Sequence, residues 1–422
     1  MALGLHIKGA LITIWFLFYI YFSNMLHLFF IGLVLCSHVL TISAYAAPHD
    51  AANTAPAQQA IPATSYLVMN LQSNTIMLGV KAHDRLPPAS LTKLMTLTLV
   101  YDAIAAGTIS LDSKVAISRK SWSQPGSRMF LEQGTHVRVQ DLIHGIAVVS
   151  GNDASVAVAE HIAGNEAAFA VLMNDKAQSI GMHNTHFMNA TGLPHAEHYS
   201  SAYDLSLLAA YIHKKYPQLL SVMQQKHYTY NQIKQNNRNH LLWTDTTVTG
   251  MKTGHTDRAG YCLVVSAQRD DNTLLAVSLG SKSEHTRAQA GKMLLHYGDY
   301  YFKHITIASD TPLPKVKTRY ARTSHIQPRL AFSKSLTLPK DKAVVKTRVE
   351  LIDEVYAPLK PGTVIGHYHI SCQGGTDSIP IVAVDNLESA PFLSRVYDWI
   401  DLQWTLGLRY ITHCIGFNQG RA

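Results

Sequence analysis

The stretch that decides the fold is Pro88-Ala89-Ser90-Leu91-Thr92-Lys93-Leu94-Met95-Thr96. It predicts the start of a helix, because prolines precede it and a run without Gly or Pro continues to residue 106. Ser90 then falls in the first turn, and Lys93 lies on the same helix face. A serine hydroxyl needs a base within reach, and a lysine amine becomes one when burial or a nearby cation lowers its pKa. The pair indicates nucleophilic catalysis; the alternative is a helix-start serine beside an exposed lysine.

Composition narrows the class of protein. The 422 residues leave room for two domains, and 47% hydrophobic with 15% charged residues is typical of a folded chain. A net charge of +8 favours an anionic partner, but no zinc spacing, RNP stretch or heptad arm occurs, so we expect no nucleic acid. Four cysteines without a C-x-x-C pair argue against a disulfide framework and leave open whether Cys262 and Cys372 pair.

Residues 1–46 are expected to be a signal peptide. No Lys, Arg, Asp or Glu occurs between Lys8 and Asp50, and the run ends in the small-x-small pattern Ala44-Tyr45-Ala46. The apolar run is longer than that of an ordinary signal peptide, so a retained membrane anchor and a start at Met25 stay open. Residues 47–63, rich in Ala, Pro, Gln and Thr, are expected to be a flexible lead-in.

Apolar runs predict the strands around the Ser90 helix. Residues 65–70 and 76–80 indicate two strands joined by a turn, and residues 261–267 and 274–280 indicate adjacent buried strands. Lys252 should lie on an edge strand beside the site, where an extended peptide could add as a further strand and Gly254 would permit close approach. Its charge suits a terminal carboxylate, or a lowering of the pKa of Lys93.

A second candidate is Ser150-Gly151-Asn152-Asp153, after a helix predicted at residues 140–149. Gly151 breaks that helix and presents Ser150 and Asn152, a hydroxyl and a carboxamide that can relay a proton and hold an amide without adding charge. Asp153 is expected to cap the next helix, residues 154–163.

Two histidines, His195 and His198, lie in the loop at residues 191–201. No third ligand lies near them and the loop is not an HExxH helix, so we expect neither a metal nor another cofactor.

Each motif alone is weak, but Ser90-x-x-Lys93, Ser150-x-Asn152 and Lys252-Thr253-Gly254 follow one another in the order known from penicillin-binding proteins and class A β-lactamases. With residues 89–96, 198–200, 237–239 and 252–256, the chain closely resembles the low-molecular-mass penicillin-binding proteins. These are serine-type D-alanyl-D-alanine carboxypeptidases of the penicillin-binding protein 5 type. The resemblance covers roughly residues 65 to 390.

The resemblance implies a role for each motif residue. Ser90 would attack the penultimate D-alanine carbonyl and form an acyl-enzyme, with Lys93 as proton acceptor and Ser150 passing the proton toward the leaving D-alanine. The backbone amides of Ser90 and His255 would form the oxyanion hole. The substrate-binding residues that it implies are Asn152, Arg238, Lys252, Thr253, Gly254 and His255. Arg128 departs from the family, whose members often have a small residue at that position.

The resemblance also implies an α/β catalytic domain of the penicillin-binding and β-lactamase type, with helices around an antiparallel sheet, at residues 64–310. Residues 315–348 carry ten Lys or Arg against one acid, Asp341, and alternate in polarity from 345 to 351, which predicts a half-buried strand. We therefore expect an all-β, sandwich-like domain at residues 311–390. Its basic face suits anionic lipid or wall polymer, or is merely solvated.

The tail at residues 391–422 predicts an amphipathic helix. Ser394, Asp398, Asp401 and Thr405 form a polar stripe, and the opposite stripe is apolar, with Trp404 in it. The family often attaches to the inner membrane in this way, so a membrane surface is the expected partner. The alternative is a helix docked on the β domain.

The expected enzyme is an exported D-Ala-D-Ala carboxypeptidase at the periplasmic face of the bacterial inner membrane, acting on pentapeptide stems of peptidoglycan. β-Lactams are expected as covalent inhibitors. No Glu-x-x-x-Asn occurs between Asn152 and Lys252, which argues against efficient lactam hydrolysis. A DD-endopeptidase on cross-links and a non-catalytic peptidoglycan-binding protein are the alternatives.

Overall fold

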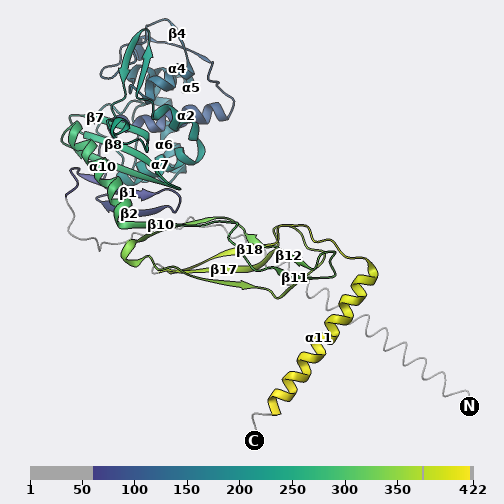
Figure 1. Ribbon diagram of the computed structural model, residues 1–422. Coiled ribbons are helices and arrows are strands. Elements are labelled where there is room, and N and C mark those ends of the chain that lie inside the picture. Colours follow the sequence, from purple (N-terminus) through teal and green to yellow (C-terminus); the bar gives the residue numbers. More distant parts are fainter. Residues whose placement is uncertain (1–59, 373–374, 419–422) are drawn as a thin grey trace, which may run out of the picture. The chain divides into compact units, whose positions relative to one another are not determined.

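This computed structural model describes residues 60–372 and 375–418 of the chain. The predicted signal peptide and most of the lead-in lie outside the described residues. The described elements begin with β1 and end with the helix α11 (Figure 1).

The Ser90 motif belongs to a region built on one five-stranded antiparallel sheet in the order β2-β1-β9-β8-β7. Its strands are β1 (Ser65–Asn70), β2 (Thr75–Val80), β7 (Val248–Thr256), β8 (Gly260–Arg269) and β9 (Asn272–Ser281). The four strands predicted from apolar runs are confirmed. Among the described strands, β7 pairs with β8 alone, so Lys252 lies on an edge strand as expected.

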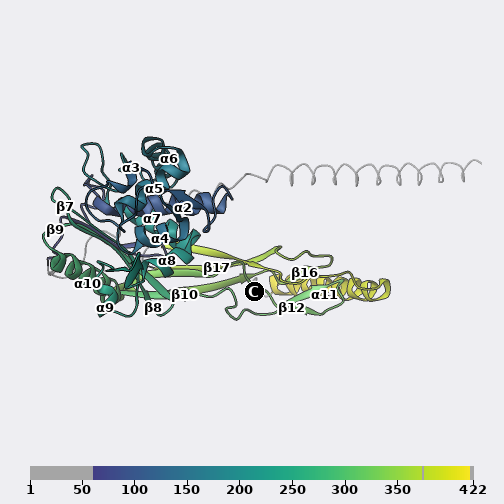
Figure 2. The ribbon, with the colours of Figure 1, turned by 90° about the horizontal axis from the view of Figure 1, so that it is seen from above.

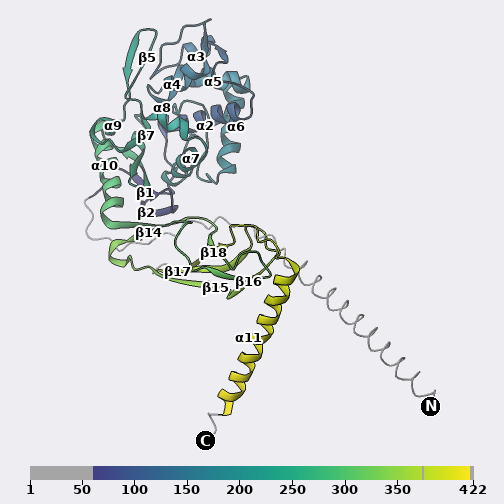
Figure 3. The same cartoon turned by 45° about the vertical axis from the view of Figure 1, so that its right-hand side comes forward.

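Helices cover both faces of this sheet. They are η1 (Ala89–Thr92), α2 (Lys93–Ala105), α3 (Arg119–Trp122), α4 (Val139–Ala147), α5 (Asn152–Ala163), α6 (Glu166–Ser179), α7 (Ala202–Lys215), α8 (Pro217–Met223), α9 (Leu241–Thr244) and α10 (Glu284–Tyr301). Figure 1 and Figure 3 show α10 on one face and the group containing α2, α6 and α7 on the other. Figure 2 shows the same layers from above.

The strand β1 explains why both faces must be covered. Leu67 and Met69 pack into the core shared with α2, α4 and α7, whereas Tyr66 and Val68 pack into the core shared with α10. Successive side chains of a strand point to opposite faces, so an unbroken apolar run needs an apolar layer on each side. Two two-stranded antiparallel sheets complete this region, β3 (Lys114–Ala116) with β4 (His136–Arg138) and β5 (His227–Tyr230) with β6 (Ile233–Asn236).

The C-terminal β region has its own apolar core, which includes Leu330, Ile370, Ile379 and Ile381. Its elements are β10 (Phe302–Ile307), β11 (Val316–Arg319), β12 (His325–Ile326), β13 (Arg329–Leu330), β14 (Lys334–Pro339), η2 (Lys340–Lys342), β15 (Lys346–Leu351), β16 (Glu354–Tyr356), β17 (Val364–Cys372) and β18 (Gly375–Val382). β10 pairs with β14, so this pairing crosses the boundary predicted between residues 310 and 311.

The strand predicted at residues 345–351 forms as β15, but it is not half-buried as its pattern indicated. β15 pairs with β17 at the edge of its sheet, and its residues from Lys346 to Glu350 are exposed, Val349 by 38%. An alternating pattern gives burial only where a second layer covers one face, which β15 lacks along most of its length. Cys262 and Cys372, which the sequence left open, are both free.

The predicted amphipathic helix forms as α11 (Phe392–Asn418). Its polar stripe contacts the β region: the Asp398 carboxylate accepts a hydrogen bond from the Tyr320 amide at 2.7 Å, and Asp401 pairs with the buried Arg319. The other stripe is open, with Leu393 81% and Trp404 72% exposed. Within the described part of the chain, no single helix has the length and apolarity to cross a membrane; α5 and α6 pass only as a pair bent by 84°.

Candidate active site

Ser90 lies in the 3-10 turn η1, and Lys93 is the first residue of α2, which continues that turn. The predicted helix therefore begins with a tighter turn. Lys93 is fully buried, and its Nζ donates a hydrogen bond to Ser90 Oγ at 3.0 Å. The spacing of three residues thus brings the lysine amine and the serine hydroxyl together as expected.

Two further acceptors surround the Lys93 amine. Its Nζ donates to Asn152 Oδ1 at 2.7 Å and to the Thr191 carbonyl at 2.6 Å. The Asn152 amide is itself oriented, because its Nδ2 donates to the Pro125 carbonyl at 2.6 Å and its oxygen must then face Lys93. Asn152 is the first residue of α5, so the start of that helix positions its amide.

The protonation state of Lys93 decides whether its amine can accept a proton from Ser90. An ammonium has three hydrogens for its three partners, but a neutral amine has two hydrogens and a lone pair. The carbonyl and amide oxygens only accept, so they take both hydrogens, and the lone pair faces the Ser90 hydroxyl. Burial, and secondarily the positive charge of Arg238, lower the pKa of Lys93 to about 7, while Asp153 opposes the shift. Lys93 is therefore able to accept the Ser90 proton near neutral pH.

Ser150 and Lys252 form the second pair of the site. Ser150 has a φ of 63°, an uncommon backbone conformation for serine, and its Oγ accepts a hydrogen bond from Lys252 Nζ at 3.0 Å. Lys252 also donates to the Thr253 carbonyl at 2.9 Å. Burial, with the charges of Lys93 and Arg238, holds the pKa of Lys252 well below its usual value. The sequence suggested that Lys252 lowers the pKa of Lys93; burial and Arg238 are the main causes instead.

The edge strand β7 runs directly beside Ser90. A Cβ at Gly254 would lie 3.0 Å from both the Ser90 nitrogen and the Pro88 carbonyl oxygen, so the close approach predicted for this glycine is real. Thr253 is buried, whereas His255, two residues later, is exposed and stacks on Tyr261 with ring centroids 4.0 Å apart.

Arg238 is an exposed residue between two buried asparagines, and its backbone carbonyl accepts a hydrogen bond from the Arg287 guanidinium at 2.9 Å. Arg287, on α10, is buried and is a further positive charge that lowers the pKa of Lys252. The sequence offered no motif for Arg287, because it acts from a helix behind the sheet.

Asp153 does not cap α5 as the sequence suggested; that position is Gly151. The Asp153 carboxylate instead accepts hydrogen bonds from the Met129 amide at 3.0 Å and the Leu131 amide at 3.1 Å. The backbone amide of the preceding residue, Asn152, donates a hydrogen bond to the Ser127 carbonyl at 2.7 Å. The start of α5 therefore holds the loop that contains Arg128, whose exposed guanidinium lies 5.5 Å from the Phe130 ring centroid.

His198 is a buried structural residue. Its Nδ1 accepts from the Met188 amide at 3.2 Å, which leaves the proton on Nε2 to be donated to Thr92 Oγ1 at 2.8 Å. Burial lowers the pKa of His198 to about 4, so the ring is neutral. Nowhere in residues 60–372 and 375–418 do three His, Cys, Asp or Glu side chains gather as they would around a metal.

A family model described as D-alanyl-D-alanine carboxypeptidase matches residues 52–283. The chain is 36% identical over 351 residues to D-alanyl-D-alanine carboxypeptidase DacA of Haemophilus influenzae, covering 81% of this chain and 89% of that protein.

Solved structures give the same result. Penicillin binding protein 5 from Haemophilus influenzae has a TM-score of 0.67 at 36% identity and covers 80% of this chain and 100% of its own. Penicillin-binding protein D2 from Listeria monocytogenes, solved in an ampicillin-bound form, has a TM-score of 0.54 at 27% identity, covering 58% of this chain and 99% of its own. The resemblance and the fold expected from the motifs are thereby confirmed, and the chain belongs to the D-alanyl-D-alanine carboxypeptidase family of serine peptidases.

Proposed function

We propose that Ser90 is the nucleophile of this carboxypeptidase, that Lys93 is its base, and that the substrate is the pentapeptide stem of peptidoglycan. The observation that carries this proposal is the Lys93 amine, whose two acceptor-only partners leave its lone pair to Ser90 Oγ. Ser90 Oγ attacks the penultimate D-alanine carbonyl as its proton moves to Lys93 Nζ. The carbonyl oxygen gains negative charge, which the backbone amides of Ser90 and His255 would stabilise.

The leaving D-alanine needs a proton on its nitrogen when the peptide bond breaks. Ser150 is the donor in this proposal: its hydroxyl, held by Lys252, gives a proton to the leaving nitrogen and takes up the proton that Lys93 received from Ser90, which returns Lys93 to its neutral form. Water then attacks the acyl-enzyme, loses a proton to Lys93, and releases the shortened stem with Ser90 regenerated.

The substrate's terminal carboxylate needs positive charge and hydrogen-bond donors, and its own negative charge would favour the ammonium form of Lys252, whose pKa is held low in the free site. We assign Lys252, Thr253 and Arg238 to this carboxylate, and Asn152 to the substrate amide. Gly254 allows an extended peptide to lie along the edge of β7, where main-chain hydrogen bonds would add to binding. A β-lactam presents a carbonyl and a carboxylate to the same groups, so we also propose covalent acylation of Ser90 by penicillin; the ampicillin-bound Listeria relative supports this.

The direct test is intact mass after incubation with penicillin, followed by D-alanine release from diacetyl-Lys-D-Ala-D-Ala. We expect one adduct and D-alanine release for the wild type, neither for Ser90→Ala, and both for the control Ser123→Ala, which alters an exposed serine. An adduct that persists in Ser90→Ala would refute the assignment. An adduct without D-alanine release, together with cleavage of cross-linked muropeptide dimers, would favour the endopeptidase.

We further propose that α11 attaches the protein to a membrane surface. The polar stripe is occupied by its bonds to the β region, which leaves the apolar stripe, including Leu393, Tyr397 and Trp404, facing solvent. An exposed apolar stripe opposite a polar one is typical of helices that lie in a membrane interface. Sedimentation with lipid vesicles tests the proposal: Trp404→Asp should lower the bound fraction, whereas Gln403→Asp, on an exposed polar neighbour, should leave it unchanged.

Export completes the proposal. Residues 1–46 would direct the chain across the inner membrane and be removed after Ala46, leaving the enzyme at the periplasmic face. N-terminal sequencing of the protein from the envelope of a producing bacterium tests this: an N-terminus at Ala47 is expected, and an intact leader would indicate a retained anchor.

A further inference from the structure

The third partner of the Lys93 amine is a backbone carbonyl in a loop. The conformation of that loop must therefore keep the carbonyl directed at the amine. Thr191 is buried, and its carbonyl oxygen lies 2.6 Å from Lys93 Nζ. Gly192 follows with a φ of 82°, and a Cβ at this position would lie 1.9 Å from the Ala89 carbonyl oxygen. The loop is thus pressed against the segment that carries Ser90.

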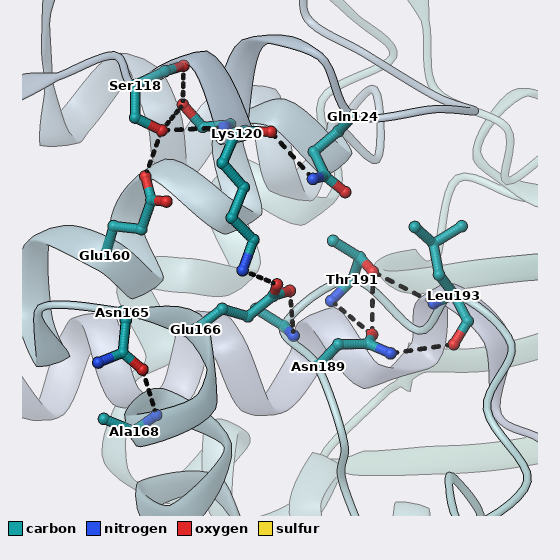
Figure 4. Close-up of polar contacts among 12 residues, drawn as sticks. Ser118, Lys120, Gln124, Glu160, Asn165, Glu166, Ala168, Asn189, Thr191 and Leu193 are labelled. Carbon is teal, nitrogen blue, oxygen red and sulfur yellow. Dashed lines mark hydrogen bonds and ion pairs between the residues drawn. The ribbon is translucent and has the colours of Figure 1, made fainter.

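One side chain organises this loop internally. Asn189 Oδ1 accepts hydrogen bonds from the Thr191 amide at 3.2 Å, from Thr191 Oγ1 at 2.9 Å and from the Gly192 amide at 2.7 Å. Its Nδ2 donates to the Leu193 carbonyl at 3.0 Å. Figure 4 shows the contacts of Asn189 with Thr191 and with the Leu193 carbonyl. Both polar atoms of Asn189 are used within four residues of itself, and both peptide groups that flank the Thr191 α-carbon are fixed.

Side chains of neighbouring helices hold Ala190, the residue between Asn189 and Thr191, in place. Its amide donates to Glu166 Oε1 at 3.2 Å, and its carbonyl accepts from Thr96 Oγ1 at 2.7 Å. The other oxygen of Glu166 pairs with Lys120 Nζ at 2.9 Å, as Figure 4 also shows. The start of α6 and the second turn of α2 therefore anchor the loop, while Asn189 sets the direction of the carbonyl that follows.

We propose that Asn189 is a positioning residue for the reaction, acting through the Thr191 carbonyl on Lys93. This inference rests on the proposed roles of Ser90 and Lys93. If the carbonyl turned away, neutral Lys93 would keep one fixed acceptor, Asn152, and could give its second hydrogen to Ser90 Oγ. The lone pair would then face elsewhere, and the amine could not take the Ser90 proton. Asn189 makes no contact that selects substrate, so its loss should slow the chemical step and leave binding intact.

The experiment compares Asn189→Leu, Asn189→Asp and the control Asn174→Leu. The Asn174 side chain makes hydrogen bonds with the Phe187 amide and carbonyl, in the segment before this loop. Asn174→Leu therefore removes a similar set of side-chain to backbone hydrogen bonds, but none to a residue that contacts Lys93. The measurement is the acylation rate constant at saturating penicillin from pH 6 to 9, with the half-saturating concentration and the melting temperature of each variant.

Asn189→Leu should lower the rate constant by about 10- to 100-fold, the usual cost of a misplaced catalytic group, with half-saturation unchanged. Asn174→Leu should stay within about twofold of the wild type at saturation. Asn189→Asp keeps an acceptor oxygen for the loop amides and should recover most of the rate. Its carboxylate also favours the Lys93 ammonium, so the midpoint of its pH profile should move to higher pH.

Three outcomes would overturn the proposal: Asn189→Leu acylates at the wild-type rate, it loses no more than Asn174→Leu does, or its defect lies in half-saturation. If Asn189→Leu does not fold, Asn189→Asp decides alone, because an unshifted pH midpoint would mean that position 189 does not act on Lys93. Loss of the penicillin adduct in Ser90→Ala is scored separately, so a failure of the proposed nucleophile is distinguishable from a failure of the Asn189 proposal.

Discussion

Acylation by penicillin should rise across neutral pH and then level off, because Lys93 accepts the Ser90 proton only when it is neutral. The pKa of Lys93 is about 7. The neutral fraction then grows from about one tenth at pH 6 to about nine tenths at pH 8, so the rate constant should rise about tenfold and reach a plateau. A lysine with its ordinary pKa would give a rise of about a hundredfold over the same interval, with no plateau.

Removing a contributing charge sharpens this prediction. Arg238 is the second cause of the lowered pKa after burial, so Arg238→Gln should raise the pKa of Lys93 and move the midpoint of the profile to higher pH. Arg322→Gln is the matched control, since Arg322 is an exposed arginine of the C-terminal β region that pairs with Glu388. Its profile should equal that of the wild type.

The assay is quenched-flow mass spectrometry of the adduct at saturating penicillin. Saturation matters because Arg238 is also assigned to the substrate carboxylate, and its loss would otherwise mix weaker binding with slower chemistry. A rate constant that is flat from pH 6 to 8, or that keeps rising tenfold per unit above pH 8, would refute the role of Lys93 as the base. A midpoint that moves to lower pH in Arg238→Gln would refute the electrostatic argument.

Three further outcomes follow from contacts in the site. Gly254→Ala should slow acylation by penicillin, since the new methyl would meet the Ser90 amide at 3.0 Å and displace β7; an unchanged rate would mean that the strand yields without cost. Asp153→Asn should lower the free energy of unfolding by about 1–3 kcal/mol, measured by urea denaturation, because one of two loop amides loses its acceptor; an unchanged value would contradict this. Cys262 is buried with its pKa raised to about 11, so a thiol reagent at pH 8 should label it only after unfolding, and rapid labelling at Cys262 in the native protein, located by peptide mass mapping, would count against the core described.

Much of the site could be predicted because its residues lie on regular elements. A spacing of three residues places Lys93 beside Ser90 in any helical turn, and an apolar run after the Lys252 motif places β8 next to β7. The Thr191 carbonyl could not be found this way, since every residue has one and only tertiary packing aims it. Asn189, two residues before that threonine and three before a glycine, was the available signal in the sequence.

Asp153 and β15 show where local pattern and tertiary packing diverge. An aspartate beside a helix start is a frequent cap, yet here the carboxylate binds the amides of a loop more than twenty residues away. The alternation in β15 resembles that of a covered strand, but burial depends on a second layer that the sequence of one strand does not encode. For α11 the two stripes could be predicted, and docking on the β domain was one of the two alternatives, but the sequence did not show that the polar stripe would make the contact.

The burial of Lys93 also carries a cost for folding. Its pKa is about 7 in the folded chain against an ordinary value of 10.5, so between these values the unfolded chain binds a proton that the folded chain does not. Stability therefore rises with pH across this window, and below pH 7 the folded state bears the full penalty of about 5 kcal/mol. Lys93→Met, which removes the charge and keeps the chain length, should raise the melting temperature most at pH 6 while abolishing acylation; a lower melting temperature there would refute the argument. In the proposed mechanism the Lys93 amine is the base, so selection for catalysis, and not for stability, accounts for a lysine at this buried position.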